Sequence, residues 1–351
     1  MNITVLAGGW SPERDVSLTS GSLIANALMA RGHRVLLLDP YLGVDLPEGT
    51  NVRALFRSEG EYHHAVREDI PDLSVLRRAT GNGDALIGRN VPVLCRAADV
   101  VYNALHGDMG ENGTLQGFLD CYGIRYTGTG AIGAMLSMDK DLSKRLLRAA
   151  GVATPDWIVL YPATEPDVRE RILREIGLPC VIKPCSCGSS VGVSIVEDEA
   201  ALDEALRFGT AYEGKLIAEK KITGRELTMG FLGDRALPPI EIRPLSGFYD
   251  YKNKYQGGQT MELCPAPITD AQTERLGQIT RRAMRALELE CYARFDYIMD
   301  AQGEMWCLEA NALPGMTPTS LLPQMAAAVG MDYGALCDAI VDMAMKKPKK
   351  N

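Results

Sequence analysis

The sequence lacks the long apolar runs and the leader features that direct a chain into or across a membrane. No stretch of 18 consecutive apolar residues occurs, so no transmembrane helix is predicted. The N-terminal MNITVLAGG contains one short apolar run, but neither a basic segment nor a small-residue cleavage site. We therefore expect a cytoplasmic protein that has no membrane partner.

Positive charge is also scarce relative to negative charge. The 351 residues include 37 Lys and Arg against 45 Asp and Glu, a net charge of −8, and the pI is near 5.2. A nucleic-acid partner is not expected, because such a partner attracts basic surfaces. We interpret the one basic run, KKPKKN at the C-terminus, as a solvated end rather than a binding arm. The hydrophobic fraction of 46% is ample for the cores of two or three domains.

Paired cysteine motifs are missing, although nine cysteines are present. Most lie singly inside apparent strands and helices, which is typical of buried, reduced thiols in a cytosolic protein. Cys185 and Cys187 stand closer together, in VIKPCSCGSSVGVSIV (181–196). A structural zinc site usually needs two spaced pairs of ligands, and thioredoxin-like redox sites use Cys-x-x-Cys at a helix start. Neither pattern occurs here, so a zinc or redox role for this loop is disfavoured.

The same loop is better suited to holding an anion. The glycines and serines of GSSVG (188–192) let backbone N–H groups approach a phosphate closely, and two hydroxyls add further donors. Lys183, at the end of the preceding strand, could place its ammonium on the same phosphate. The alternative is an ordinary Gly/Ser hairpin turn beside a surface lysine, since the Walker ending Gly-Lys-Ser/Thr is absent.

Apolar periodicity predicts an α/β protein with three parts. The first has a strand in ITVLAGG, a helix over 17–32 and a strand in HRVLLLD, the order expected for a doubly wound parallel sheet. Residues 45–95 give no assignment. One helix is predicted over 137–151, the two ends of 181–196 are predicted to pair as a hairpin, and helices are predicted from about Thr319 onward. We place the domains at 1–130, 131–217 and 218–351.

A further hairpin is predicted in ARFDYIMDAQGEMWCLEAN, with its turn at AQGE. Pairing around that turn puts Asp296 opposite Leu308 or Glu309, and the alternation of side chains can bring Arg294 and Asn311 to the same face. Oxygen atoms of Asp296, Glu309 and Asn311 would suit Mg²⁺ that carries nucleotide phosphates. The alternative is a solvent-facing hairpin held by salt bridges.

The segment LIAEKKITGREL (216–227) adds a strand that could hold a nucleoside. Its backbone groups could bond a base, and a carboxylate such as Glu219 or Glu226 could accept from ribose hydroxyls.

These pieces in this order resemble the ATP-grasp superfamily, and along nearly its whole length the chain resembles the D-alanine–D-alanine ligases. Eight segments carry the resemblance: GGWSPERDVSL, NALHGDMGENGTLQG, YTGTGAIGAMLSMDK, VIKPCSCGSSVGVS, IAEKKITGREL, FYDYKNKY, ARFDYIMD and EANALPGMTPTSL. Residues 45–95 match only as a variable insertion. The resemblance implies an ATP-grasp fold with an N-terminal doubly wound parallel-sheet domain, and a homodimer.

The resemblance also implies roles for individual residues. The phosphates of ATP would be bound by Lys140 and Lys183, and its adenine and ribose by Glu219, Lys220, Ile222 and Glu226. A mobile loop with Lys254 and Tyr255 would close over the γ-phosphate. Two Mg²⁺ (or Mn²⁺) ions would be held by Asp296, Glu309 and Asn311. D-Alanine would be bound by Glu13, His106, Arg294, Gly315, Ser320 and Leu321. The residues implied in catalysis are Glu13, Ser189, Tyr255, Arg294 and Ser320.

The reaction that the resemblance implies is ATP-dependent formation of D-alanyl-D-alanine for peptidoglycan precursors. The first D-alanine would become an acyl phosphate, with ADP and phosphate released, and Arg294 and the Gly315 N–H would stabilise the oxyanion formed when the second amine attacks. One alternative is a relative that makes D-Ala–D-Ser or D-Ala–D-lactate. A phosphotransferase would not need the acceptor segment GMTPTSLL, and a dehydrogenase would need the Gly-x-Gly-x-x-Gly that the N-terminus lacks.

The chain departs from the family pattern in three places. CSC at 185–187 replaces a stretch that often includes Arg and Glu, so a charged contact near the loop is expected to be missing. Asp15 stands where a glutamate is common, and Ala-Leu at 312–313 replaces Thr-x before PGMT. Ser189 and Tyr255, expected to bond to each other and onward to Glu13, are both present. Their presence favours a dipeptide product over an ester.

Overall fold

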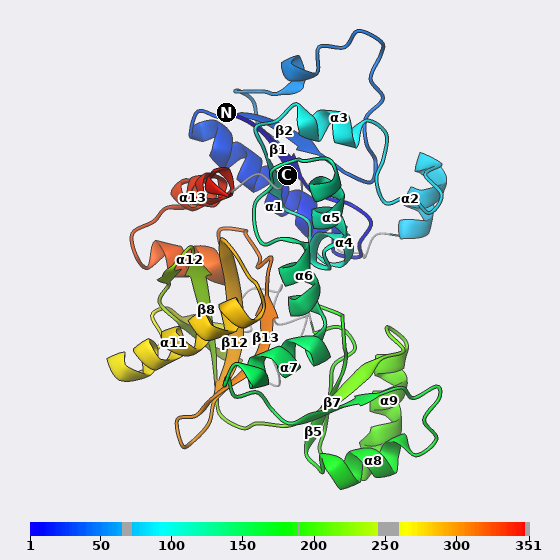
Figure 1. Ribbon diagram of the computed structural model, residues 1–351, viewed down its shortest axis with the longest axis vertical. Coiled ribbons are helices and arrows are strands. Elements are labelled where there is room, and N and C mark those ends of the chain that lie inside the picture. The colour runs from blue at the N-terminus through cyan, green and yellow to red at the C-terminus, as the bar shows by residue number, and fades with distance from the viewer. Residues whose placement is uncertain (65–71, 189, 245–259, 348–351) are drawn as a thin grey trace.

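The computed structural model describes residues 1–64, 72–188, 190–244 and 260–347. Its strands form three sheets, and each sheet is built from one continuous stretch of the chain. The N-terminal sheet lies at one end of the long axis, the middle sheet at the other, and the C-terminal sheet between them (Figure 1). The predicted α/β class is confirmed. In the described part of the chain, no helix has the length and apolar character needed to cross a membrane.

The N-terminal sheet is parallel, as predicted, with the order β2-β1-β3. Its strands are β1 (Asn2–Leu6), β2 (Arg34–Leu38) and β3 (Val100–Asn103). The crossover that parallel pairing requires is α1 (Arg14–Ala30), which begins three residues before the predicted start. The short α4 (Asp108–Glu111) and α5 (Thr114–Cys121) follow β3. Loops at the carboxyl ends of parallel strands meet at one edge, which places the residues after β1 and β3 together.

Part of the segment that the sequence left unassigned bonds to α1. It contains η1 (Val52–Leu55), α2 (Leu73–Thr80) and α3 (Val91–Arg96). The Asn26 side chain on α1 pairs with the backbone of Tyr62, accepting from its N–H at 2.9 Å and donating to its carbonyl at 2.8 Å. These contacts involve single polar atoms rather than a periodic pattern, so sequence periodicity could not predict them.

One predicted helix is two helices in the structure. The helices α6 (Ala131–Met138) and α7 (Lys140–Ala149) are separated by Asp139, whose backbone is extended with φ −78° and ψ 107°. The Asp139 carboxylate accepts from the Leu142 N–H at 3.0 Å and caps the start of α7. The prediction of a single helix over 137–151 is wrong, because an aspartate stabilises a helix start better than a helix interior.

The middle sheet is antiparallel with the order β4-β7-β5-β6. Its strands are β4 (Trp157–Leu160), β5 (Cys180–Pro184), β6 (Ser194–Val196) and β7 (Leu216–Lys220). The predicted hairpin is confirmed, with Ile182 opposite Ser194. Ile182 and Leu216 pack with α8 (Val168–Glu175) and α9 (Leu202–Thr210), which follows η2 (Glu199–Ala201). Because side chains alternate along a strand, Lys183 and Glu219 point to the opposite face.

The C-terminal sheet has the order β11-β10-β8-β12-β13, with β9 paired to β8. Its strands are β8 (Arg225–Leu232), β9 (Arg235–Ala236), β10 (Ile240–Pro244), β11 (Thr260–Leu263), β12 (Tyr292–Met299) and β13 (Met305–Asn311). Buried residues of α11 (Asp270–Ala286) pack on this sheet. Asp296 lies opposite Glu309, one of the two predicted partners, and Arg294 lies opposite Asn311. Neither predicted register holds along the whole hairpin, because Met299 pairs with Met305 and the register shifts by one residue between Tyr297 and Asp296.

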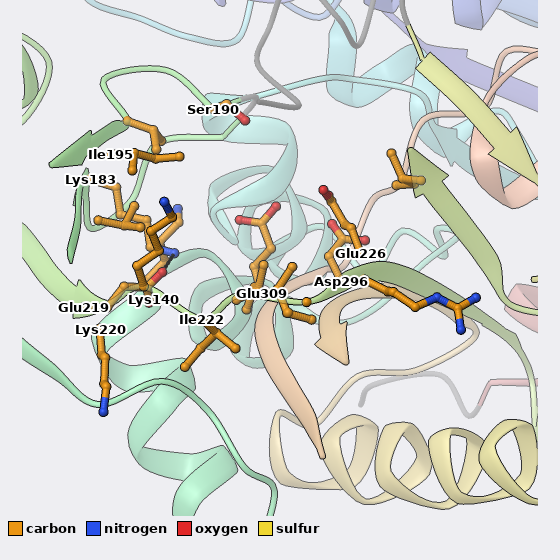
Figure 2. Close-up of a pocket in the computed structure, with 18 of the residues that line it drawn as sticks. Lys140, Lys183, Ser190, Ile195, Glu219, Lys220, Ile222, Glu226, Asp296 and Glu309 are labelled. Carbon is orange, nitrogen blue, oxygen red and sulfur yellow. Dashed lines mark ion pairs between the residues drawn. The ribbon is translucent and has the colours of Figure 1, made fainter. Parts of the chain in front are cut away.

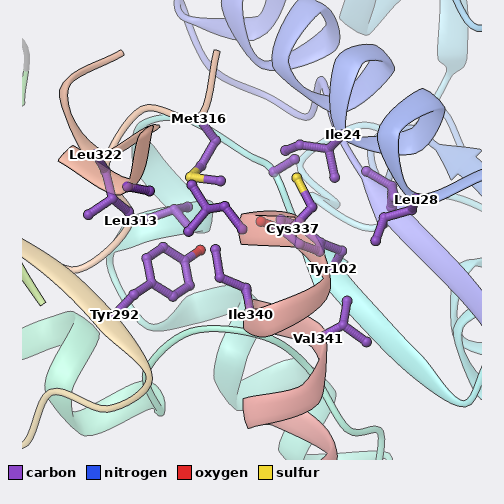
Figure 3. Close-up of a cluster of buried hydrophobic side chains, with 14 of the residues drawn as sticks. Ile24, Leu28, Tyr102, Tyr292, Leu313, Met316, Leu322, Cys337, Ile340 and Val341 are labelled. Atoms are coloured by element: carbon purple, nitrogen blue, oxygen red, sulfur yellow. The ribbon is translucent and has the colours of Figure 1, made fainter. Parts of the chain in front are cut away.

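The last helix packs against the N-terminal part of the chain. Packed against α1, the helix α13 (Tyr333–Lys346) follows α12 (Leu321–Ala327) (Figure 1). A cluster around α13 contains apolar side chains from α1, β3, β12 and the segment before α12 (Figure 3): Ile24, Leu28, Tyr102, Tyr292, Leu313, Met316, Leu322, Cys337, Ile340 and Val341. At its edge, Asp338 accepts from Arg31 Nε at 2.8 Å and pairs with His33 Nε2 at 2.7 Å. This packing fixes the N-terminal loops relative to β12 and β13.

The nine cysteines all lie among the described residues, and none forms a disulfide. Cys95, Cys180, Cys185, Cys307 and Cys337 are buried, whereas Cys187, Cys264 and Cys291 are half-buried. The prediction of buried thiols is wrong for Cys121, which is exposed at the end of α5.

Candidate active site

A cavity of about 510 Å³ opens between the middle sheet and the C-terminal sheet (Figure 2). It is lined by many of the residues predicted for the site: Lys140, Lys183, Glu219, Lys220, Ile222, Glu226, Arg294, Asp296, Glu309 and Leu321. The other lining residues include the apolar Val181, Ile195, Ile298 and Leu308. Lysines gather on one side of the cavity and the carboxylates of Glu226 and Asp296 on the other (Figure 2). A cavity with apolar walls, cations and carboxylates has the chemistry to hold a base together with its phosphates.

Lys183 and Lys140, the two lysines predicted to bind phosphate, contact oxygen atoms of the protein in this structure. Lys183 Nζ lies 2.5 Å from Glu219 Oε1, and Lys140 Nζ donates to the Cys187 carbonyl at 2.6 Å. Glu219 also lies 2.7 Å from the Nζ of Lys144, a residue that sequence reasoning missed. The available signal was spacing, because residues four apart on a helix share a face and Lys144 follows Lys140 by four.

The start of the glycine–serine loop, at Cys185 and Ser186, is hydrogen-bonded to the carboxylates of Asp139 and Glu213. The Cys185 thiol donates to Asp139 Oδ1 at 3.1 Å, and Lys215 Nζ donates to Asp139 Oδ2 at 2.8 Å. The Ser186 N–H donates to Glu213 Oε2 at 2.7 Å. Burial raises the pKa of Cys185 to about 11, so the thiol keeps the proton that it donates. Cys185 therefore acts as a hydrogen-bond donor that holds the loop on α7.

The acidic hairpin brings its predicted residues together. Asp296 accepts from the Arg294 guanidinium through both oxygens at 3.0 Å. It also accepts from Thr228 Oγ1 at 2.7 Å and from Asn311 Nδ2 at 3.0 Å. Glu309 stands opposite Asp296 and lines the cavity. Two carboxylates and an amide oxygen are a donor set that fits Mg²⁺ or Mn²⁺. No cluster of three or more His, Cys, Asp or Glu residues suited to a metal occurs in the described ranges.

The half-buried acids Glu13 and Glu111 occupy the edge where the loops after β1 and β3 meet. A Cβ built on Gly107 would lie 2.7 Å from Glu13 Oε2, so the Glu13 carboxylate rests directly on that glycine. Burial lowers the pKa of His106, whose Nε2 bonds to Ser20 Oγ at 3.2 Å. Burial and the charge of Glu13 raise the pKa of Glu111 to about 8.

Glu111 connects this edge to the main cavity. It accepts from the Gly107 N–H at 2.8 Å, and it lines a second, smaller cavity together with Lys140, Cys187 and Glu309. Sequence reasoning missed Glu111, although it stands in the acidic run LHGDMGENG. The predicted Glu13 and His106 therefore lie next to a carboxyl that also faces the lysine end of the cavity.

The predicted acceptor residues form a tight turn before α12. A Cβ on Gly315 would lie 3.0 Å from Ser320 Oγ, and Ser320 Oγ also bonds to Thr317 Oγ1 at 2.7 Å. Leu321 follows directly and lines the main cavity. Ser189, Lys254 and Tyr255 lie outside the described residues, so the roles predicted for them stay predictions.

Two antiparallel sheets that enclose a cavity lined by lysines and carboxylates define the class of nucleotide-binding ligases with an ATP-grasp fold. The chain belongs to the D-alanine–D-alanine ligase family. The family model described as the D-Ala–D-Ala ligase N-terminus matches residues 2–129, and the one described as its C-terminus matches residues 146–342.

Individual relatives match along the whole chain. The D-alanine–D-alanine ligase of Pediococcus pentosaceus is 40% identical over 349 residues and that of Nitratidesulfovibrio vulgaris 39% over 346, covering 97% and 98% of both chains, respectively. The solved Bacillus anthracis ligase in complex with ATP superimposes with a TM-score of 0.74 at 29% identity, covering 99% of this chain and 98% of that one. The VanG D-Ala:D-Ser ligase of Enterococcus faecalis gives 0.75 at 25% identity, covering 98% and 99%. The predicted fold class and family are confirmed.

The anchoring contact of Cys185 predicts how the loop responds to substitution. Changing both Cys185 and Cys187 to Ser should leave the rate of ADP formation within about tenfold, because backbone N–H groups would carry the phosphate contacts.

Cys185→Val has a different expected result, because it removes the hydrogen-bond donor to Asp139 while keeping a side chain of similar size. Losing a hydrogen bond worth about 1 kcal/mol should raise the KM for ATP roughly fivefold. Steady-state kinetics with Cys121→Val as control measure both effects. Equal ATP KM values for the Cys185→Val and wild-type proteins would contradict the anchoring role.

The raised pKa of Glu111 predicts a pH-dependent stability. Because the folded protein holds a proton that the unfolded chain releases above its ordinary pKa of 4.5, stability is lost as pH rises from there through about 8. Glu111→Gln keeps an acceptor for the Gly107 N–H and should flatten this part of the profile. Urea unfolding at several pH values between 5 and 8 measures it, with the exposed Glu48→Gln as control. Parallel profiles for wild type and Glu111→Gln would show that Glu111 is ionised in the folded state.

Proposed function

We propose that this chain is an ATP-dependent ligase that joins two D-alanine molecules into D-alanyl-D-alanine and releases ADP and phosphate. The observation that carries the proposal is the convergence of Lys140 and Lys183 with Asp296 and Glu309 on one cavity. The acidic edge around Glu13 adjoins its lysine end. Membership of the family supplies the substrate and, through the ATP-bound relative, the nucleotide.

The nucleotide would lie across the cavity. Its base would pack on the apolar wall near Ile222, with Glu219, Lys220 and Glu226 bonding to the base and ribose. Its phosphates would lie between Lys140, Lys183 and the glycine–serine loop, whose N–H groups suit an anion. A loop with Lys254 and Tyr255 would close over the end and keep water from the acyl phosphate.

The first D-alanine would sit at the edge formed by Glu13 and His106. The Glu13 carboxylate would bind its ammonium, and His106 would lie near its carboxylate, the group that takes the γ-phosphoryl. Carboxylate oxygen is a poor leaving group, which is why phosphorylation must precede amide formation. Asp296, Glu309 and Asn311 would hold two Mg²⁺ or Mn²⁺ ions, which when bound neutralise phosphate oxygens and orient the phosphoryl group.

The second D-alanine would sit near Ser320 and Leu321, with Ser320 on its carboxylate. Its neutral amine would attack the acyl phosphate, and phosphate would leave. Arg294 and the Gly315 N–H would stabilise the oxyanion of the tetrahedral intermediate, a role worth about 3–4 kcal/mol per donor. Arg294 lines the cavity while bound to Asp296, so it is already held in place.

We further propose a cytoplasmic homodimer that serves peptidoglycan precursor synthesis, with domains at 1–130, 131–217 and 218–351. The family resemblance supports these features.

The products test the proposed reaction directly. The protein is incubated with ATP, Mg²⁺ and a panel of D- and L-amino acids, D-serine and D-lactate, and phosphate release is read together with product mass. D-Alanine should give ADP, phosphate and the dipeptide. AMP and pyrophosphate would rule out the acyl-phosphate route. A dominant mixed product with D-serine or D-lactate would instead assign the chain the activity of the relatives that make those products.

The hairpin carboxylate provides a second test. Glu309→Gln removes a charge from a proposed metal ligand, and turnover should fall by about 10³-fold or more, while the fold persists. Circular dichroism checks the fold, and Glu304→Gln, in the turn of the same hairpin, is the control. Near-normal turnover of Glu309→Gln at ordinary Mg²⁺ would mean that this carboxylate does not hold the metal.

A further inference from the structure

Glu219 is buried between two lysines that differ in what they can reach. Its side chain is 4% exposed, with Oε1 2.5 Å from Lys183 Nζ and Oε2 2.7 Å from Lys144 Nζ. Lys183 lines the cavity, as Glu219 does. Lys144 is absent from the cavity wall, and its side chain is 1% exposed. Any ligand in the cavity could therefore meet Lys183 directly but could be affected by Lys144 only through another residue.

The ammonium of Lys144 is held by three protein groups. Besides Glu219, it donates to Thr154 Oγ1 at 2.7 Å and to the Pro155 carbonyl at 3.2 Å. Of the three donors that a lysine has, two are used by Thr154 and Pro155, and Glu219 holds the ammonium as an ion pair. The same ammonium lies 5.3 Å from the centre of the Trp157 ring. Lys144 is thus fixed in position, in contrast to a lysine that must move to a phosphate.

We propose that Lys144 is a positioning residue for nucleotide binding, which holds Glu219 in place as a carboxylate so that Lys183 can leave it for the phosphates. The inference rests on the proposed function, because that function places the phosphates at Lys183. In the present arrangement two positive charges flank one negative charge. When Lys183 turns to a phosphate, Glu219 keeps Lys144 as its partner.

Charge energetics support this division of roles. Burial alone would raise the pKa of Glu219, but the two lysines outweigh it and lower that pKa to about 2. A buried carboxylate left without any cation is strongly disfavoured. Without Lys144, Glu219 would retain Lys183 as its one remaining cation, and the phosphates would have to compete for it. Burial and repulsion by Lys183 lower the pKa of Lys144 to about 8. When Lys183 moves from Glu219 to a phosphate, the repulsion between the two ammonium groups is therefore also relieved.

A double-mutant cycle on ATP binding tests the inference. Lys144→Met keeps the unbranched side chain, without its terminal ammonium, and removes the charge. The dissociation constant of ATP should rise by at least about tenfold. In a Glu219→Gln background there is no carboxylate to compete for Lys183, so adding Lys144→Met should change that constant by less than about twofold. Isothermal titration calorimetry measures binding, thermal unfolding checks the fold, and the exposed Lys346→Met is the control.

Three results would overturn the inference. A folded Lys144→Met variant with unchanged ATP affinity would leave Lys144 a purely structural role. Equal weakening in both backgrounds would show that Lys144 does not act through Glu219. If Lys144→Met does not fold, Thr154→Val loosens the same ammonium and should weaken ATP binding a few fold only when Glu219 is present; the same loss in both backgrounds would also contradict the inference.

Measurements on the wild-type protein separate this inference from the proposed function. If the wild-type protein binds ATP but forms no dipeptide, the proposed reaction is wrong, and the double-mutant cycle on ATP binding still decides the role of Lys144. If the wild-type protein binds no ATP, the proposed function and this inference are both wrong. A wild-type protein that binds ATP and forms the dipeptide, with an additive cycle, would overturn the role of Lys144 alone.

Discussion

The capping of α7 by Asp139 is the contact on which the arrangement of the cavity depends. Asp139 separates α6 from α7, and its carboxylate caps the start of α7. The same carboxylate accepts hydrogen bonds from the Cys185 thiol and the Lys215 ammonium. Cys185 directly follows β5 and Lys215 directly precedes β7, so α7 cannot shift relative to the middle sheet without breaking bonds to a carboxylate. From this fixed start, α7 directs Lys140 to the glycine–serine loop and Lys144 to Glu219.

Among the described residues of the cavity, the buried ionic groups Lys140, Lys183, Glu219, Glu241 and Asp296 each have a partner in the protein. Lys183 lies on Glu219, and Arg294 lies on Asp296. A ligand with phosphates and metal ions would exchange these partners rather than meet bare charges, which reduces the cost of desolvation. The proposed chemistry therefore needs small movements of a few side chains and the closure of one loop, while the sheets that hold them stay in place.

The parts of the structure that follow from local pattern could be predicted from the sequence. Alternation of side chains predicted the hairpin that pairs Asp296 with Glu309, and the strand–helix–strand order predicted the parallel sheet. The break at Asp139 was missed because the helical pattern continues through it, although aspartate favours a helix start. The bonds that Asp139 makes to Cys185 and Lys215 depend on the folded chain and could not be predicted. The spacing of Lys144 from Lys140 places both lysines on one face of the helix, but it does not show that Lys144 is buried against Glu219.

Contacts between residues that are distant in the chain also could not be predicted from the sequence. The raised pKa of Glu111 comes from its enclosure beside Glu13, and these two residues are far apart in the chain. The attachment of Tyr62 to Asn26 likewise depends on the folded position of α1. Resemblance to a family supplied the positions of individual site residues where local pattern could not. It gave no indication of which buried groups hold those residues in place.

The most direct test of this account is a crystal structure with a non-hydrolysable ATP analogue and Mg²⁺. We expect the base against the apolar wall near Ile222, the phosphates within hydrogen-bonding distance of Lys140 and Lys183, and metal density at Asp296 and Glu309. Glu219 should then be bonded to Lys144 and no longer to Lys183. A nucleotide bound elsewhere, or bound in the cavity with its phosphates away from both lysines, would contradict the account.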